Sequence, residues 1–374
     1  MPLGARDTSS LVILTGWDAT ELKNFQLIDG TNYAAIVSQM NAALGALNAE
    51  LYSDPLWAGL VSYTDQPELE YRVGVSNGFE EHTEHGRPDP KRADTIGHML
   101  PLKSYDRMLG WTWDYLRQAR TPQIQADIAD AIKDARDNWR LRILTRLLKR
   151  GDDSGKKNGL GSTGLSPGFA TTAASTGVDF TPPTYGGTSF ASTHEHYVAI
   201  AGGVYTNAVF TDIKAELREH GHEPPYNVLI SPSDESQFTA TNLTDFVPTA
   251  KTNIKYGTGV DLATIADMPL TPGVYPAGVI SDCVVWVVPG MPQYYGVGYK
   301  SYGANSQRNP LRIRLFKGQS RPMVTAMPDP NAGSGMSPLN HLMLFTEFGV
   351  GVNDRTAATP RYVNNATWSD GTAT

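Results

Sequence analysis

The chain has 374 residues, of which 40% are hydrophobic, and its formal net charge is −7. This length exceeds the roughly 250 to 300 residues at which one hydrophobic core stops growing, so we expect two lobes or a body with long extensions. The acidic balance excludes a protein that grips nucleic acid tightly, the one cysteine (Cys283) excludes an internal disulfide framework, and the lack of an apolar leader or long apolar run predicts a soluble protein that is not secreted.

The first 67 residues contain one recognisable helix, over residues 31–51. Ile36, Met40, Leu44 and Leu47 recur at steps of three and four, and this spacing places them on one face of a helix. We expect that face to dock on the rest of the protein, with residues 1–67 as an N-terminal arm.

Residues 68–111 predict a long β-hairpin. Residues 68–76 alternate like a half-exposed strand, and residues 98–108 are extended again. Residues 77–94 between them are polar and charged, contain two prolines, and have almost no apolar residue that could bury a face. We therefore expect an arm that becomes ordered only against a partner.

Residues 121–150 predict one long amphipathic helix. Thr121 followed by Pro122 is a favourable helix start, and Gly151 ends the helix. The acidic residues gather in the first half and the basic residues in the second, the order that the helix dipole favours. The apolar residues recur at steps of three and four, and we expect them to form the buried face. They are Ile124, Ile128, Ile132, Ala135, Trp139, Ile143 and Leu147.

The rest of the chain alternates loops with short strands and one further helix. Residues 151–192 are rich in Gly, Ser, Thr and Pro. After them we expect a helix over residues 198–219 and a strand over residues 226–230. Three more apolar segments predict strands, the first of them fully buried. They are residues 279–288, 311–316 and 342–352.

Two motifs of catalytic appearance fail on physical grounds. Residues 164–168 match G-x-S-x-G, but Pro167 follows the serine and has no backbone N–H for an oxyanion hole. Residues 151–157 resemble a phosphate-binding loop, but they follow a helix, their glycine spacing is one residue short, and Lys157 stands where a Mg²⁺-binding hydroxyl belongs. We therefore expect no catalytic site in this loop.

Two His-x-His pairs, His194/His196 and His220/His222, offer metal-ligand chemistry. On a strand such a pair would face one way, but no further ligand cluster with clear spacing follows either pair. Histidines at helix ends are usually solvated and titrate freely. We therefore expect surface histidines, with no metal and no cofactor.

The order of these parts resembles the major capsid protein of tailed bacteriophages, which has the Hong Kong 97 fold. Three segments carry the likeness: the helix end with its glycine-rich turn (residues 147–168), a strand and turn (residues 227–234), and the ending at residues 348–354. The resemblance implies an α+β fold and a structural subunit, not an enzyme. Such subunits self-assemble into an icosahedral shell around a double-stranded DNA genome.

The resemblance also implies a division of the chain and candidate contact residues. In the hairpin, Arg87, Asp89, Lys91 and Arg92 would make inter-subunit contacts, and in the long helix the core would include Ile128, Ile132, Trp139 and Ile143. No catalytic, cofactor-binding or metal-binding residue is implied. The implied parts are an N-terminal arm (1–67), the extended E-loop (68–111), a peripheral P domain with the spine helix (112–192), an axial A domain (193–309), and the return strands of the P domain with the C-terminus (310–374).

The implied partners are further copies of the chain in hexamers and pentamers. A separate scaffolding protein, a portal and a decoration protein would join them, packaged DNA would be touched weakly and without specificity, and no membrane is involved. The implied location is the virion, with assembly in the host cytoplasm. Two alternatives stay open: an encapsulin, which is a cellular compartment of the same fold, and a metal-dependent enzyme built on the His-x-His pairs.

Overall fold

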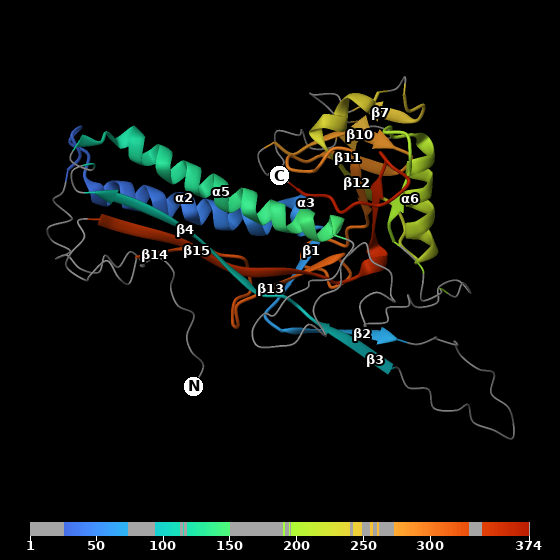
Figure 1. The fold of residues 1–374 in the computed structure, drawn as a ribbon, viewed down its shortest axis with the longest axis horizontal. Coiled ribbons are helices and arrows are strands. Elements are labelled where there is room, and N and C mark those ends of the chain that lie inside the picture. Colours follow the sequence, from blue (N-terminus) through green and yellow to red (C-terminus); the bar gives the residue numbers. More distant parts are fainter. Residues whose placement is uncertain are drawn as a thin grey trace, which may run out of the picture. The chain divides into compact units, whose positions relative to one another are not determined.

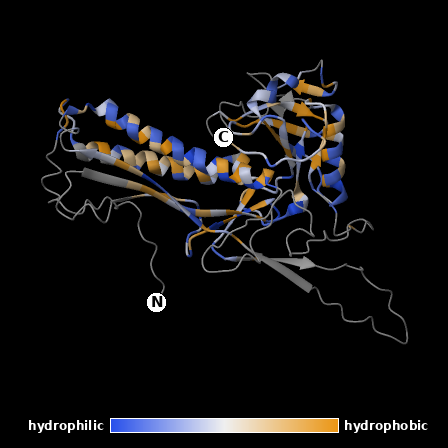
Figure 2. Cartoon of the chain, in the orientation of Figure 1, coloured by the Kyte–Doolittle hydropathy of each residue, from blue (hydrophilic) through white to orange (hydrophobic). Residues whose placement is uncertain are grey.

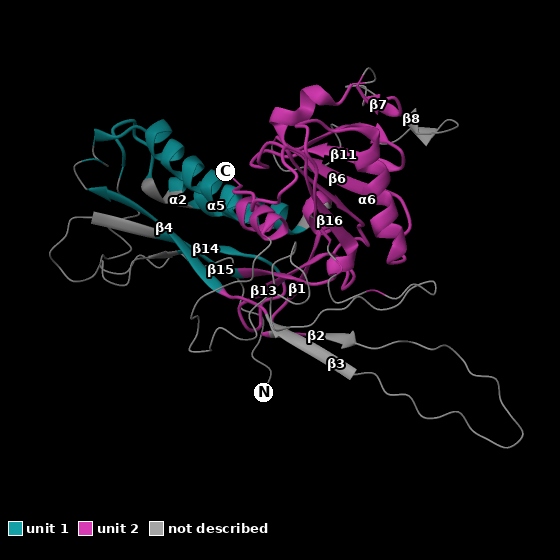
Figure 3. Ribbon diagram, turned by 45° about the vertical axis from the view of Figure 1, so that its right-hand side comes forward, with its two compact units in different colours: residues 1–52, 103–139, 321–348 teal, residues 53–102, 140–320, 349–374 magenta. Residues whose placement is uncertain are grey.

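A computed structural model shows a chain of mixed helix and sheet (Figure 1). It describes residues 26–73, 94–112, 115, 118–149, 190, 194, 196–239, 242–248, 255–256, 260–261, 273–328 and 339–373. The chain divides into two compact units (Figure 3). Unit 1 consists of Met1–Tyr52, Lys103–Trp139 and Arg321–Phe348, and unit 2 consists of Ser53–Leu102, Arg140–Ser320 and Gly349–Thr374.

Unit 1 places two long helices on three antiparallel strands of a sheet that has five strands in all (Figure 1). The central strand is β15 (Leu339–Val352), which pairs with β4 (Lys103–Thr112) along one edge and with β14 (Val324–Pro328) along the other. The helices are α2 (Tyr33–Ser53) and α5 (Thr121–Leu148). Each has an apolar stripe to bury, so the layer between helices and sheet forms the core of this unit.

Helix α2 confirms the expected helix over residues 31–51 and its buried face. Ile36, Met40, Leu44 and Leu47 are all buried. Glu50 on this helix meets Arg136 of α5 in a two-pronged ion pair, with both nitrogen–oxygen distances at 2.8 Å. This fork geometry orients both side chains and fixes the register of the two helices.

Helix α5 confirms the predicted long helix and ends at Leu148, two residues before the expected end. Its first backbone N–H, that of Thr121, donates to the Asp29 carboxylate at 2.7 Å. This hydrogen bond lowers the pKa of Asp29 to about 2. The cap of α5 therefore includes a carboxylate that is distant in the sequence. Its negative charge at the N-terminus of the helix also complements the positive end of the helix dipole.

Unit 2 is built on a seven-stranded sheet of strand order β5-β16-β12-β6-β11-β10-β7. The pairs β6–β11 and β16–β5 are parallel and the other neighbours are antiparallel. The strands are β5 (Val198–Ala199), β6 (Tyr226–Ile230), β7 (Phe246–Pro248), β10 (Tyr275–Ile280), β11 (Cys283–Val287), β12 (Tyr295–Tyr299) and β16 (Ala358–Tyr362).

Helix α6 (Asn207–Glu219) covers this sheet with its apolar face. Val209, Phe210, Ile213 and Leu217 recur at helical spacing and are buried in one cluster with side chains of the sheet. Figure 2 shows the hydrophilic residues of α6 on the opposite side. The approach is close: a Cβ on Gly298 of β12 would lie 2.4 Å from Ile213 Cγ2, so a glycine is required there.

Smaller elements complete unit 2. Strand β1 (Val61–Thr64) follows the short helix α3 (Pro55–Ala58) and pairs in parallel with β13 (Leu311–Leu315). Strands β2 (Glu68–Val73) and β3 (Asp94–Met99) form an antiparallel pair. The remaining elements are the pair β8 (Lys255–Tyr256) and β9 (Val260–Asp261) and the 3₁₀ helices Pro232–Gln237 and Arg355–Ala357. Among the described helices, none combines the length and apolarity needed to cross a bilayer.

Several strand predictions are confirmed, and two element predictions are wrong. Strand β6 has the expected bounds, and β13 alternates buried and partly buried residues as its sequence predicted. The single buried strand expected over residues 279–288 is a hairpin instead, because Ser281 and Asp282 both have positive φ and turn the chain between β10 and β11. The helix expected from residue 198 begins at Asn207, after strand β5.

The single cysteine of the chain is buried in unit 2. Cys283 lies at the start of β11 and is fully buried. Burial raises the pKa of its thiol to about 12. A thiol with such a pKa carries almost no thiolate at neutral pH, and thiolate is the reactive form.

Trp139 provides a test of the α5 stripe. Its side chain is 2% exposed and its ring centroid lies 4.7 Å from that of Phe348. Trp139→Ala should lower the free energy of unfolding by about 3 to 5 kcal/mol, because it removes a large buried side chain and leaves a cavity. Urea denaturation measures this loss. Met108→Ala, at a side chain that is 51% exposed, is the control and should cost less than about 0.5 kcal/mol.

Asp234 provides a test of pH dependence. Its buried carboxylate accepts the Tyr294 backbone N–H at 2.7 Å, and burial raises its pKa to about 6. The unfolded state therefore loses this proton at lower pH than the folded state, so the ionised group opposes folding above pH 6. Asp234→Asn removes this ionisation. The free energy of unfolding of the variant, relative to that of the parent, should therefore rise by up to about 3 kcal/mol between pH 4 and pH 7, as measured by denaturant unfolding at both pH values. A difference independent of pH would contradict this.

Candidate functional site

The base of the predicted hairpin arm is present in the structure. Strands β2 and β3 pair with Glu68 opposite Met99 and Val73 opposite Asp94. The antiparallel pairing confirms that the chain leaves and returns along one ribbon. The contact residues proposed for its tip are Arg87, Asp89, Lys91 and Arg92, and all four lie outside the described residues. Both glycine-rich motifs of residues 151–168 lie outside the described residues as well.

The expected core residues of the long helix are mostly buried within this chain. Ile128 and Trp139 are buried in unit 1, Ile143 is buried in unit 2, and Ile132 is partly buried. Their side chains are thus used largely for folding the subunit. Their part in holding an assembled spine stays a prediction.

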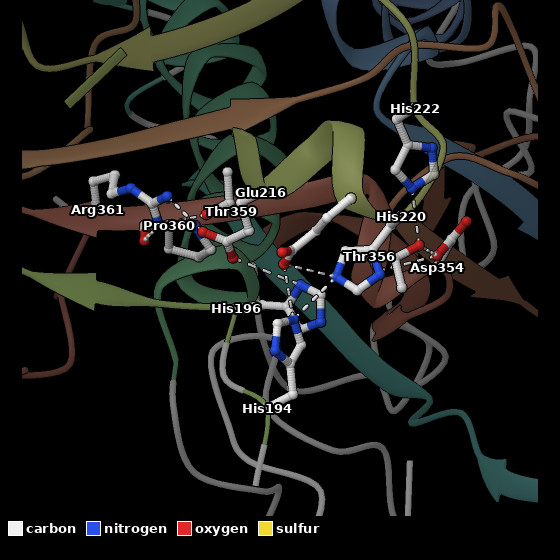
Figure 4. A network of polar contacts seen from close by, with 11 residues as sticks. His194, His196, Glu216, His220, His222, Asp354, Thr356, Thr359, Pro360 and Arg361 are labelled. Carbon is white, nitrogen blue, oxygen red and sulfur yellow. Dashed lines mark hydrogen bonds and ion pairs between the residues drawn. The ribbon is translucent and has the colours of Figure 1, made fainter. Parts of the chain in front are cut away.

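Three histidines converge in unit 2, and Figure 4 shows their rings pointing toward one another. His194 and His196 lie just before strand β5, and His220 follows the last residue of α6. One ring nitrogen from each lies within 4.8 Å of the other two. The Nε2 atoms of His194 and His220 are 3.1 Å apart.

Two glutamates from α6 border the three rings. Glu219 Oε1 lies 3.2 Å from His194 Nε2 and 3.5 Å from His220 Nε2. Glu216 Oε1 lies 3.8 Å from His196 Nδ1, and its Oε2 pairs with the buried Arg361 at 2.5 Å. Because Glu216 and Glu219 are one turn apart on α6, both carboxylates face the same cluster.

Burial keeps two of the rings neutral. Removal from water lowers the pKa of His196 well below its usual value, and the neighbouring His220 adds to this effect. Burial, together with His194, lowers the pKa of His220 to about 3. Neutral imidazole is the form that accepts hydrogen bonds or binds a metal ion.

The expectation of surface histidines is wrong for this cluster. His196 and His222 are buried, and the His220 side chain is 2% exposed. The sequence separated the residues into two pairs, whereas the fold joins His220 with His194 and His196. His222 turns away and contacts Tyr302 and Thr356 at 2.6 and 2.9 Å. The helix α6 that spans the gap brings the residues together, and sequence spacing gives no sign of it.

Comparisons with known proteins bear on the fold. No model of a known protein family matches the chain, and no curated protein matches it in sequence. A solved structure titled Mycobacterium phage Patience matches with a TM-score of 0.62 and 19% identity, over 93% of this chain and 96% of that chain. This likeness shows that the two chains share a fold along nearly their whole lengths.

Two further structures are similar at lower scores. The capsid of Ralstonia phage GP4 matches with a TM-score of 0.48 and 10% identity, over 86% of this chain and 93% of that chain. A holo-SrpI encapsulin complex from Synechococcus elongatus matches with a TM-score of 0.45 and 10% identity, over 82% of this chain and 86% of that chain. These two TM-scores are too similar and too low to decide whether this chain is more like a phage capsid protein or an encapsulin.

The ion pair beside the cluster provides a stability test. Arg361 is 1% exposed, and its guanidinium depends on Glu216 for charge neutralisation. Glu216→Ala should lower the free energy of unfolding by about 3 to 5 kcal/mol, because it leaves a buried charge without its counter-ion. Replacing both residues, as Glu216→Leu with Arg361→Met, should recover most of that loss. Denaturant unfolding in the presence of a chelator measures both; equal losses in the single and double variants would contradict the argument.

Proposed function

We propose that this protein is the structural subunit of a tailed-phage capsid and that it self-assembles into an icosahedral shell around double-stranded DNA. The observation that carries the proposal is the fold shared with the Mycobacterium phage Patience structure over almost all of both chains. The order of parts in the sequence, which resembles the major capsid protein of tailed phages, supports it independently.

The architecture supports the assignment of parts within the Hong Kong 97 fold. The ribbon β2–β3 is the base of the extended E-loop, α5 is the spine helix of the P domain, and strands β13 to β15 are the return strands. The sheet of unit 2 with α6 corresponds to the A domain at the centre of a capsomer. On this proposal the residues of the arm, Lys91 among them, contact a neighbouring subunit.

The described surface carries features that suit association. Strand β4 pairs with β15 along all ten of its residues, and no other described strand pairs with β4. An open edge of this length can accept a strand or loop of another copy. Exposed apolar side chains lie in both units, among them Met108 in unit 1 and Phe316 in unit 2. Interfaces of a permanent assembly bury such groups.

The charge of the chain fits a container. With a net charge of −7 the subunit as a whole repels a polyanion, so packaged DNA would be contacted weakly and without sequence specificity. We infer a structural and not an enzymatic role, with copies of the same chain in hexamers and pentamers as the main partners. A scaffolding protein, a portal and a decoration protein are the further partners of this proposal, and the virion is its location.

Electron microscopy of the purified full-length protein tests the proposal. Closed shells or ring-shaped capsomers are expected, and particles recovered from phage-producing cells should contain DNA. Shells filled with a protein cargo and free of DNA would favour an encapsulin. A protein that stays monomeric at high concentration, with or without a scaffold, would contradict the proposal.

Deletion of residues 77–94 tests the role of the arm. The shortened protein should keep the melting temperature of the parent subunit, because this polar segment offers almost no apolar residue to a core. It should fail to form closed shells, because the inter-subunit contacts proposed for the arm are gone. A control variant replaces the same segment with Gly and Ser at equal length. It separates the effect of losing the side chains of the arm from the effect of shortening it. Normal shells from the deletion, seen by negative staining, would show that the arm is dispensable.

A further inference from the structure

The histidine cluster of unit 2 contains a buried side chain whose polar atoms lack hydrogen bonds. His196 is 1% exposed, and neither of its ring nitrogens has a hydrogen-bond partner among the described residues. Buried polar groups are nearly always satisfied, because leaving one unpaired costs about 1 to 3 kcal/mol, so this arrangement calls for a missing ligand.

The spacing of the neighbouring donors matches a metal site. The three contacts among His194 Nε2, His220 Nε2 and Glu219 Oε1 measure 3.1, 3.2 and 3.5 Å. Ligands about 2.0 to 2.1 Å from a tetrahedral Zn²⁺ ion lie roughly 3.3 Å apart. These three atoms thus already outline one face of a tetrahedron, and a ring nitrogen of His196 lies within 4.8 Å of ring nitrogens of His194 and His220.

A hydrogen bond between two neutral imidazoles explains only part of this geometry. If one Nε2 of the His194–His220 pair carries a proton, that pair is satisfied. His196 gains nothing from it, and Glu219 remains beside both rings. One cation at the centre would bind a ring nitrogen of His196 together with the Nε2 atoms of His194 and His220 and the Glu219 carboxylate.

We propose that unit 2 binds one divalent transition-metal ion, with Zn²⁺ as the expected ion, in a closed four-coordinate site. Its ligands are His194, His196, Glu219 and His220. Three imidazoles and one carboxylate form a donor set that suits Zn²⁺ better than Mg²⁺ or Ca²⁺, which prefer oxygen ligands. With four protein ligands no position is left for a substrate, so the site is structural.

The surroundings support the ligand arrangement. Glu216 Oε1 lies 3.8 Å from Nδ1 of His196, which is beyond hydrogen-bond distance but places the carboxylate on that side of the ring, so we assign Nε2 to the metal. Once it closes to hydrogen-bond distance, a carboxylate on the far nitrogen of a metal-binding histidine orients the ring and raises its basicity. Arg361 in turn holds Glu216. Phe190, whose ring centroid lies 4.3 Å from that of His220 and 4.9 Å from that of His194, covers the cluster with an apolar surface.

The ion would join two segments that are distant in the sequence. His194 and His196 precede the edge strand β5, whereas Glu219 and His220 lie at the end of α6. Strand β5 is only two residues long and pairs only with β16 in the described sheet. A metal bridge would therefore anchor a short edge strand that has little else to hold it. Since all ligands lie in one unit, the ion should bind whether or not shells form.

Metal binding to the purified full-length chain tests the proposal. After chelator treatment and dialysis, titration with Zn²⁺ should show one tight site per chain, and Co²⁺ in its place should give the visible absorption of tetrahedral coordination. His194→Ala should weaken Zn²⁺ binding by more than the roughly 10- to 100-fold that loss of an outer partner such as Glu216 causes. His194 is part-exposed, so this variant should still fold.

Controls separate this site from adventitious binding. His85→Gln removes a histidine that is not one of the proposed ligands and should retain the parent stoichiometry. In the parent, Zn²⁺ should raise the melting temperature, and a chelator should reverse that rise; neither reagent should act on His194→Ala. The proposal is overturned if the parent binds no Zn²⁺ at micromolar concentration, or if His194→Ala and the parent bind it equally.

Discussion

The apolar stripe of helix α5 is the constraint on which both units of this protein depend. A helix of 28 residues is about 42 Å long, further than one small core extends. Its first part is buried in unit 1, as Ile124 and Trp139 show, and its last part is buried in unit 2, as Ile143 and Leu147 show. Strand β15 likewise continues from one unit into the other. Both elements therefore supply residues to each of the two units.

The polar interior of unit 2 is organised on a different principle from its core. The cluster of α6 against the sheet is apolar and gains stability from burial in the ordinary way. Beside it, Arg361, Glu216 and His196 are removed from water at an electrostatic cost that hydrophobic residues of the same size would avoid. Buried polar groups can have a role that apolar side chains could not fill. In the proposed metal site, that role is to orient a metal ligand.

The two units bear on how the subunit of the proposed shell would be stable before it assembles. Each unit has its own buried residues, and the parts proposed for assembly lie at sheet edges and in the β2–β3 ribbon. Among the described strands, β4 pairs only with β15, so its other edge is the side at which another strand could be added. Folding and association therefore draw on different groups of the same molecule.

Elements whose pattern is local could be predicted from the amino-acid sequence. The periodicity of α2 and α5, the alternation of β13 and the polar interruption between β2 and β3 are readable because side-chain direction repeats with the backbone period. The turn at Ser281 was missed because its positive φ angles interrupt an apolar run without a glycine. Only the tertiary structure decided the strand order and the meeting of His194 with His220. Twenty-six positions separate these two residues, and their distance in space is set by how α6 packs on the sheet, which no spacing along the chain encodes.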